Sequence, residues 1–185
     1  MEDSIKNARA AIFDFDGTLW NIELSWQDLY ERLTDAGRLY GHVGEFGSII
    51  DAYLWADKMY GARKKMIEVQ DEFEQEGLPG TPVKAGRAAA KWRLKRCLAT
   101  GILSLNTSST IERVVGGWGV YPIISIDKVR KPKPDPEGLL KALDVLKCSP
   151  GEAVFIGNSD TDRKCARAAS VAYVDVTEIR EAWFL

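Results

Sequence analysis

The sequence predicts an α/β fold in which a doubly wound parallel sheet carries a small α-helical cap inserted after the first strand. A short apolar run at residues 10–15 ends in a turn signal and is typical of a buried strand. Apolar periodicity is helical, without a clear strand, over residues 21–80, and strands then alternate with helices to the end. We expect a core of residues 1–20 and 81–185 and a cap of residues 21–80.

Composition limits the classes of function. A chain of 185 residues with 45% hydrophobic residues is long enough for one domain with a modest insertion. Its net charge of −2 gives no general attraction to nucleic acid or to a membrane, and it contains no apolar run long enough to span a bilayer. The polar start is unlike a secretory signal, and the three cysteines (Cys97, Cys148 and Cys165) are typical of free thiols. We expect a cytoplasmic protein that acts on a small molecule.

The first strand ends in an unusual way. Asp14 and Asp16 follow its apolar residues at once, and Gly17 and Thr18 come next. Carboxylates are seldom fully buried unless they are paired or bind a cation. Acids at the carboxyl end of a strand lie where parallel α/β sheets bind their ligands.

Three helices are expected in the cap. Ser25 caps the first, a second carries Ile49 to Tyr60, and a third lies within residues 62–76. Residues 77–80, GLPG, end the segment. The aromatic residues between Trp26 and Tyr53 either form the core between these helices or line a substrate cleft.

The second part of the chain supplies the remaining elements. Thr81 and Pro82 predict a helix start, as N-cap and first helical residue, and that helix runs to about Thr100. Four strands follow, separated by helices that begin near Ser108, Asp135 and Arg163: residues 101–107, 122–126, 153–156 and 172–176.

The ends of these strands gather polar residues at one edge of the predicted sheet. Beside Asp14 and Asp16 we expect a hydroxyl and a helix start, a lysine and a second acidic loop: Thr107 and Ser108, Lys131, and Asn158, Asp160 and Asp162. Hard oxygen ligands suit Mg²⁺, whereas donors and a cation suit the oxygens of a phosphoryl group. The combination favours phosphate-ester chemistry with Mg²⁺.

In these features the sequence resembles the haloacid dehalogenase (HAD) superfamily, and among its members the phosphatases with a helical cap that are similar to phosphoglycolate phosphatase. Residues 14–19, DFDGTL, match the first motif, and Thr107 at a strand end matches the second. Residues 131–136, KPKPDP, match the third, and residues 157–162, GNSDTD, match the fourth. The order is that of the family, whose core is Rossmann-like. The cap is shorter than in the larger members.

The resemblance implies a Mg²⁺-dependent phosphatase that hydrolyses a small phosphomonoester. Asp14 would attack phosphorus and form an aspartyl-phosphate, and Asp16 would act as acid and then as base. Thr107, Ser108 and Lys131 would hold the phosphoryl oxygens. The implied ligands of Mg²⁺ are Asp14, Asp16, Asn158 and Asp162.

Alternatives remain open at two places. Asn158 stands where the family has Asp, so a weakly active or inactive protein that binds a phospho-ligand or a protein partner is the second reading. Lys128, Arg130 and Lys133 lie near Lys131 and compete with it for the same role. Other chemistry of the family, such as phosphonate cleavage or that of a phosphomutase, is a further alternative.

Overall fold

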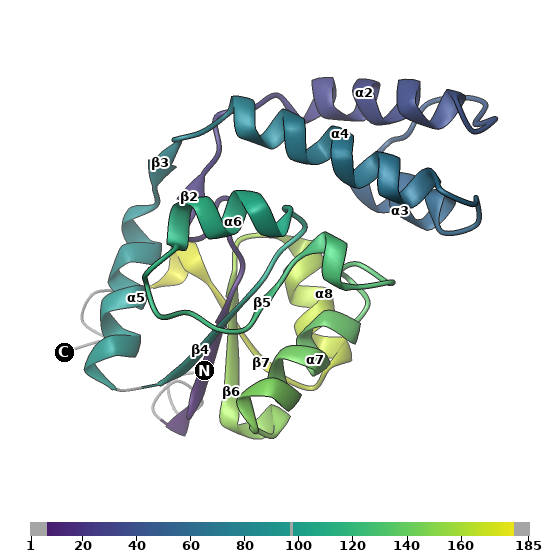
Figure 1. Cartoon of the computed structure of the whole chain (residues 1–185). Helices are drawn as coiled ribbons and strands as arrows, with labels where there is room; N and C mark the ends of the chain where they lie inside the picture. Colours follow the sequence, from purple (N-terminus) through teal and green to yellow (C-terminus); the bar gives the residue numbers. More distant parts are fainter. Residues whose placement is uncertain (1–6, 97, 180–185) are drawn as a thin grey trace.

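The computed structural model describes residues 7–96 and 98–179. Five parallel strands form its central sheet, in the order β5-β4-β1-β6-β7 (Figure 1). The first strand therefore lies in the middle, between β4 and β6. The strands span Ala10–Phe13 (β1), Ala99–Leu103 (β4), Ile123–Ile124 (β5), Ala153–Gly157 (β6) and Ala172–Asp175 (β7).

Helices cover both faces of the sheet, as the sequence predicts. Side chains of β1 alternate between the faces: Ile12 packs with α7 and α8, and Phe13 packs with α6. Part of α5 packs on the same face as α6. The four helices span Lys84–Lys95 (α5), Ser108–Val115 (α6), Glu137–Leu146 (α7) and Asp160–Ala168 (α8). Short 3₁₀ turns lie at Ile126–Lys128, Pro150–Glu152 and Val176–Glu178.

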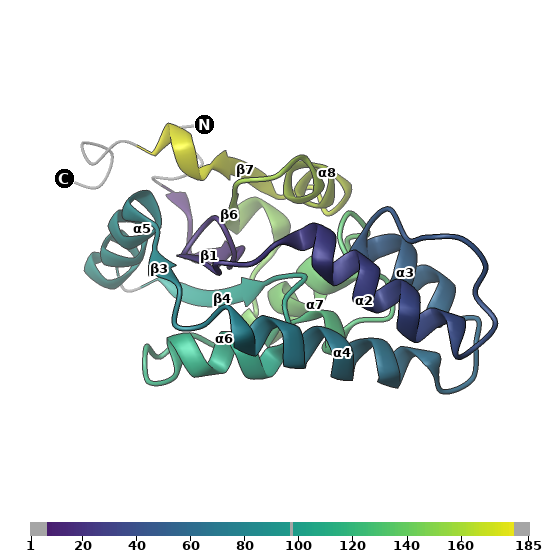
Figure 2. The same cartoon turned by 90° about the horizontal axis from the view of Figure 1, so that it is seen from above.

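Between β1 and β4 the chain leaves the sheet and forms a helical insert. Two short antiparallel strands, β2 (Trp20–Asn21) and β3 (Thr81–Pro82), make a stem through which it departs and returns. The insert then extends to one side of the core (Figure 2). Its helices span Trp26–Arg38 (α2), Ile49–Ala56 (α3) and Ala62–Glu76 (α4).

The insert has its own apolar core. Leu29 and Leu33 of α2, Tyr53 of α3 and Met66 of α4 are fully buried together. Ile126, from the loop after β5, belongs to the same cluster, so the insert packs directly on the rest of the chain. Burial of aromatic and aliphatic side chains of this size stabilises the contact by roughly 1.5–3 kcal/mol each.

One predicted element is wrong. Thr81 and Pro82 do not begin a helix; they pair with Asn21 and Trp20 in the stem, and α5 starts at Lys84. The local signal of a Thr-Pro helix start is genuine, but pairing with a segment 60 residues earlier overrides it.

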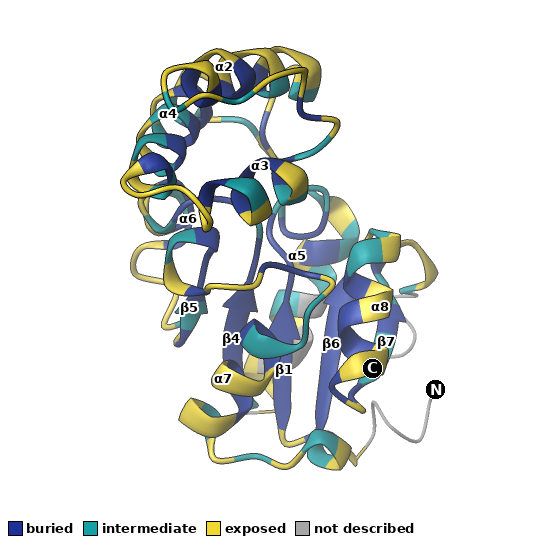
Figure 3. Cartoon of the chain, turned by 90° about the vertical axis from the view of Figure 1, so that its right-hand side faces the viewer, coloured by how far each residue is buried: buried dark blue, intermediate teal, exposed yellow. Residues whose placement is uncertain are grey.

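Burial is deepest in the sheet (Figure 3). Its three central strands are almost completely buried, whereas the helices expose their outer sides. Within residues 7–96 and 98–179, no helix is long and apolar enough to cross a membrane. Cys148 and Cys165 are free thiols, and Cys97 lies outside the described residues.

Candidate active site

Asp14 stands at the carboxyl end of the central strand. Its backbone N–H donates to the carbonyl of Ile156 in β6 (2.8 Å), which fixes the end of β1, and only 6% of the residue is exposed. Burial raises the pKa of Asp14 to about 6, against the opposing effect of the Lys133 cation. A charged Asp14 therefore depends on the positive charge beside it.

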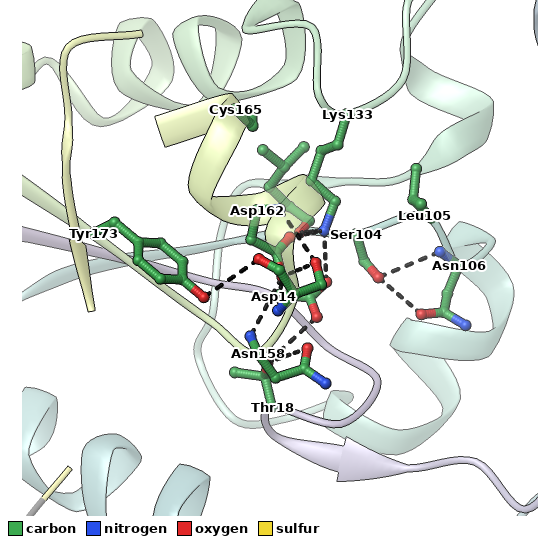
Figure 4. Close-up of polar contacts among 12 residues, drawn as sticks. Asp14, Thr18, Ser104, Leu105, Asn106, Lys133, Asn158, Asp162, Cys165 and Tyr173 are labelled. Atoms are coloured by element: carbon green, nitrogen blue, oxygen red, sulfur yellow. Dashed lines mark hydrogen bonds and ion pairs between the residues drawn. The ribbon is translucent and has the colours of Figure 1, made fainter. Parts of the chain in front are cut away.

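That positive charge comes from Lys133. Its ammonium donates to Oδ1 of Asp14 (2.8 Å) and to Oδ1 of Asp162, and it is buried between the two carboxylates (Figure 4). Burial alone would lower the pKa of Lys133, but the two carboxylates outweigh it and raise the pKa. The lysine remains charged and joins the end of β1 to the first turn of α8.

The prediction of Lys131 for this position is corrected. Lys131 is exposed, and its ammonium lies 3.9 Å from Asp135, one turn along the same loop. Only Lys133 is directed into the core. Both lysines precede a proline, so the local sequence does not distinguish them. Val129 is buried, and the direction that the loop takes after it determines which lysine enters the core.

Ser104 and not Thr107 is the first hydroxyl beyond β4. The strand ends at Leu103, four residues before the predicted end at Thr107, and Ser104 lines the same pocket as Asp14 and Lys133. Its hydroxyl donates to Oδ1 of Asn106 (2.8 Å), within a tight turn. The signal that could have found Ser104 is its position as the first polar residue after the apolar run.

Thr107 is instead the N-cap residue of α6, and its hydroxyl makes hydrogen bonds to Asp71 and Glu74 of the insert. Ser108 is bound to Asp127 through both its backbone N–H (2.9 Å) and its hydroxyl (2.7 Å). Neither residue lines the pocket of Asp14. Their predicted phosphate-binding role is therefore corrected: both hold the loops behind the site.

Asp162 is placed in the site, but not as an open metal ligand. One carboxylate oxygen accepts from Lys133, and the other accepts from the hydroxyl of Ser159 and from the backbone N–H groups of Asn158 and Ser159. Asp162 is fully buried and its oxygens are already used. The structure thus assigns it to holding Lys133 and the loop after β6, which corrects the expectation that it binds the metal.

Asn158 lies where the sequence predicts, opposite Asp14. The hydroxyl of Thr18 is 3.3 Å from Oδ2 of Asp14 and 3.2 Å from Oδ1 of Asn158, so these two oxygens face a common point. Glycine at position 17 allows the Asn158 side chain to lie against the backbone of the first loop. Its φ is +73°, and a Cβ there would lie 2.1 Å from the Asn158 amide nitrogen.

Asp16 faces the entrance of the insert. Its Oδ1 accepts from the backbone N–H of Ile22 (2.8 Å), just after the stem. Burial raises the pKa of Asp16 to about 6, although the hydrogen bond from Ile22 opposes the shift. The carboxyl group is thus held by the segment that connects the core to the insert.

The donor set fits Mg²⁺. The carboxylate of Asp14 and the amide oxygen of Asn158 provide hard oxygens beside the pocket, and the two acids of the lining, Asp14 and Asp16, outnumber its single lysine, Lys133. The described residues contain no group of three or more His, Cys, Asp and Glu side chains arranged for a metal.

A pocket of about 330 Å³ opens above these residues. Its floor comes from the core and its roof from α2, α3 and the segment before α3. The lining residues are Asp14, Asp16, Trp26, Tyr30, Ser48, Ile49, Ile50, Ser104, Leu105, Asn106, Lys133, Asn158, Ser159 and Thr161. The aromatic residues of the insert thus serve both expected purposes: Tyr53 is core, and Trp26 and Tyr30 line the cleft.

Known proteins resemble the chain in sequence and in fold. The phosphoglycolate phosphatase of Rhodospirillum rubrum is 26% identical over 90% of this chain and 78% of its own length. A HAD-superfamily hydrolase of subfamily IA from Geobacter sulfurreducens superposes with a TM-score of 0.59 at 23% identity, over 91% and 87% of the two chains. Mutant CbbY from Rhodobacter sphaeroides, in complex with xylulose-1,5-bisphosphate, gives 0.63 at 14% identity, over 91% and 85%.

The family model for haloacid dehalogenase-like hydrolases matches residues 8–170. This range contains four of the five strands of the sheet, all but β7, together with the complete insert and every residue of the site described above. The order of the four motifs and the arrangement of Asp14, Lys133 and Asp162 agree with that match. The chain belongs to the haloacid dehalogenase-like hydrolases.

Proposed function

We propose that the protein is a Mg²⁺-dependent phosphatase that hydrolyses a small phosphomonoester through an aspartyl-phosphate on Asp14. The observation that carries the proposal is the buried ion pair of Lys133 with Asp14, at the floor of the pocket. A carboxylate held by a lysine beside open space is an activated oxygen nucleophile. Its neighbour two residues later, Asp16, supplies a second carboxyl group on the same turn.

In the first step, an Asp14 carboxylate oxygen forms a bond to phosphorus as the bond to the leaving oxygen breaks. Asp16 donates a proton to that leaving oxygen. Lys133 and the hydroxyl of Ser104, which would turn from its present acceptor Asn106, bind the phosphoryl oxygens. In the second step, Asp16 accepts a proton from the water that attacks the aspartyl-phosphate, and inorganic phosphate leaves.

Mg²⁺ would be held by the Asp14 carboxylate, the Asp16 backbone carbonyl and the Asn158 amide oxygen. When bound, the ion would neutralise the negative charge of the phosphoryl group during transfer. Asp162 contributes indirectly, because it keeps Lys133 in position between the two strand ends.

The helical insert acts as a cap in this proposal. It covers the pocket with Trp26, Tyr30 and Ile49, and excludes water from the phosphoryl group. The substrate is a soluble phosphorylated metabolite, and the free thiols of Cys148 and Cys165 agree with a cytoplasmic enzyme.

The test is phosphate release from a panel of phosphomonoesters with Mg²⁺, combined with mass spectrometry of the acid-quenched protein. Wild type is expected to turn over and to show a phosphoryl adduct on Asp14. Asp14→Asn is expected to lose at least about 10³-fold in kcat. Asp160→Asn is the matched control, since Asp160 is an exposed acid that pairs with Lys164.

Two results would contradict the proposal. One is full activity of Asp14→Asn; the other is no phosphate release by wild type from any ester. The second result would favour the alternative function, in which Asn158 marks a site that binds a phospho-ligand or partner without turnover.

A further inference from the structure

The roof of the pocket is apolar and aromatic. Trp26 and Tyr30 of α2 and Ile49 and Ile50 of α3 provide most of it, and the only other contribution of the insert is Ser48. All charged residues in the lining belong to the floor: Asp14, Asp16 and Lys133. The part of the pocket that lies beyond the phosphoryl group is therefore electrically neutral.

The arginines of the insert are used elsewhere. Arg32 pairs with Glu76, Arg38 with Asp35, and Arg63 with Asp57. Arg63 also donates to the carbonyls of Ile126 and Val129 in the core. Within the described residues, no Lys, Arg or His of the insert lines the pocket.

The start of α3 does not replace a cation. Ser48 is the N-cap residue, and its hydroxyl donates to the carboxylate of Asp51 (2.8 Å) and accepts from the N–H of Asp51 (3.1 Å). The positive end of this helix thus already faces an acid. The roof can bind a hydroxyl or carbonyl group but offers nothing that compensates a second negative charge.

We infer that the preferred substrates are monophosphates of uncharged alcohols with an apolar or ring face, and that esters with a second anionic group are disfavoured. The inference rests on the proposed phosphatase function. A carboxylate on the leaving group would lose its hydration at the roof without a cation to pair with, which disfavours its binding. A ring would pack on Trp26 and Tyr30 and gain from burial. The chain therefore differs in expected substrate from its relative named for phosphoglycolate, an acid.

Matched pairs of esters test this inference. The first pair comprises the phosphates of 4-hydroxybenzamide and 4-hydroxybenzoate, which share the ring and differ by one charge. The second comprises 2-phosphoglycolamide and 2-phosphoglycolate. At neutral pH with Mg²⁺, kcat/KM of each amide is expected to exceed that of its carboxylate by at least about tenfold.

A variant supplies the missing charge. Ile50→Arg places a guanidinium in the roof and is expected to shift the amide-to-carboxylate ratio by at least about tenfold toward the carboxylate. Ile50→Met is the matched uncharged control and is expected to keep the ratio within about threefold. The wild-type ratio alone decides the proposal if the arginine variant does not fold.

The outcomes separate the two proposals. If both pairs are hydrolysed and kcat/KM of each carboxylate equals or exceeds that of its amide, the substrate inference is overturned and the phosphatase proposal stands. An unchanged ratio in a folded Ile50→Arg shows that the leaving group does not contact the roof and also overturns it. Absence of phosphate release from all four esters and from the wider panel removes the phosphatase proposal and the inference with it.

Discussion

The carboxylate of Glu74 on α4 accepts two hydrogen bonds from Thr107 of the core, from its backbone N–H (3.0 Å) and from its hydroxyl (2.9 Å). Its other oxygen accepts from the side-chain amides of Asn106 (3.0 Å) and Gln70 (2.7 Å). Gln70 also donates to the carbonyl of Leu105 (2.7 Å). The insert is thus bound to the turn that carries Ser104.

Removing this carboxylate is expected to destabilise the protein. Both oxygens of Glu74 accept hydrogen bonds in a fully buried place. In Glu74→Gln one of them becomes an NH₂ group, which is itself a donor and leaves the neighbouring donors without an acceptor. We expect a loss of about 2–4 kcal/mol in the free energy of unfolding, measured by urea denaturation. Glu72→Gln on the exposed side of the same helix is the control, expected within about 0.5 kcal/mol of wild type. Equal stability of the two variants would contradict the role of Glu74.

Lys133 and Lys131 offer a second variant with a matched control. Lys133→Met leaves Asp14 and Asp162 buried without a cation, and we expect a loss of about 3–5 kcal/mol at neutral pH. This loss should shrink on acidification, because burial raises the pKa of Asp14 and its carboxyl group then becomes neutral. Turnover should fall by at least about 10²-fold, whereas Lys131→Met should leave stability and turnover nearly unchanged. A larger loss of activity in Lys131→Met would reverse the assignment.

Asn158→Asp tests the metal site. The new carboxylate would face Oδ2 of Asp14 across Thr18. Without metal, like-charge repulsion should lower the melting temperature; with Mg²⁺, tighter binding should raise it above the value of wild type. Calorimetric titration is expected to show at least about tenfold higher Mg²⁺ affinity. Unchanged affinity and rate would mean that the amide is a competent ligand.

Glu137 is expected to make the stability of the loop that carries Lys133 depend on pH. Burial would raise its pKa, but hydrogen bonds from Lys141 and from the backbone of Arg130 and Lys131 outweigh it and lower the pKa from 4.5 to about 2. A carboxyl group whose pKa is lower in the folded than in the unfolded protein stabilises the fold at every pH above its unfolded pKa. This contribution is lost as the pH falls through the folded pKa of about 2.

In Glu137→Gln we therefore expect a loss of about 1–2 kcal/mol above pH 5, allowing for partial exposure, and a smaller difference from wild type on acidification. Denaturation at a series of pH values measures it. Asp144→Asn on the same helix is the control, because its ion pair with Lys147 is almost fully exposed. A difference that grows toward acid pH would be inconsistent with the lowered pKa.

Most of the fold could be predicted because its signals are local. The strand before Asp14 and the third helix of the insert follow from apolar periodicity and strong breaks in the chain. The end of β4 could not be predicted in this way. The run Ser104-Leu105-Asn106-Thr107 still alternates, and only the pairing of β4 with β5, which ends at Leu103 and Ile124, determines that the strand stops there.

The same limit applies to the site. Asp14, Asp16 and Asn158 could be located because they directly follow strands or belong to compact motifs. Lys133 could not be separated from Lys131, since both precede proline in a polar loop. The choice depends on two carboxylates, one 119 and one 29 positions away in the sequence. The position of Asp162 near Asp14 follows from its motif, whereas its hydrogen bonds to Lys133, Ser159 and the backbone after β6 depend on the geometry of the loop and cannot be derived from the sequence.

The stem of β2 and β3 brings the two ends of the insert together. Trp20 pairs with Pro82 and Asn21 with Thr81, so the two ends of the insert are neighbours in space. A tight two-residue turn suffices to join neighbouring antiparallel strands, whatever the length of the segment it replaces. The connection between β1 and β4 can therefore differ in length between residues 22 and 80 without moving the ends of the strands that it joins. The insert is joined covalently to the core only at the two strands of the stem, and its other attachments, at Ile126 and at Glu74, are non-covalent contacts that a change of the insert would have to keep or replace.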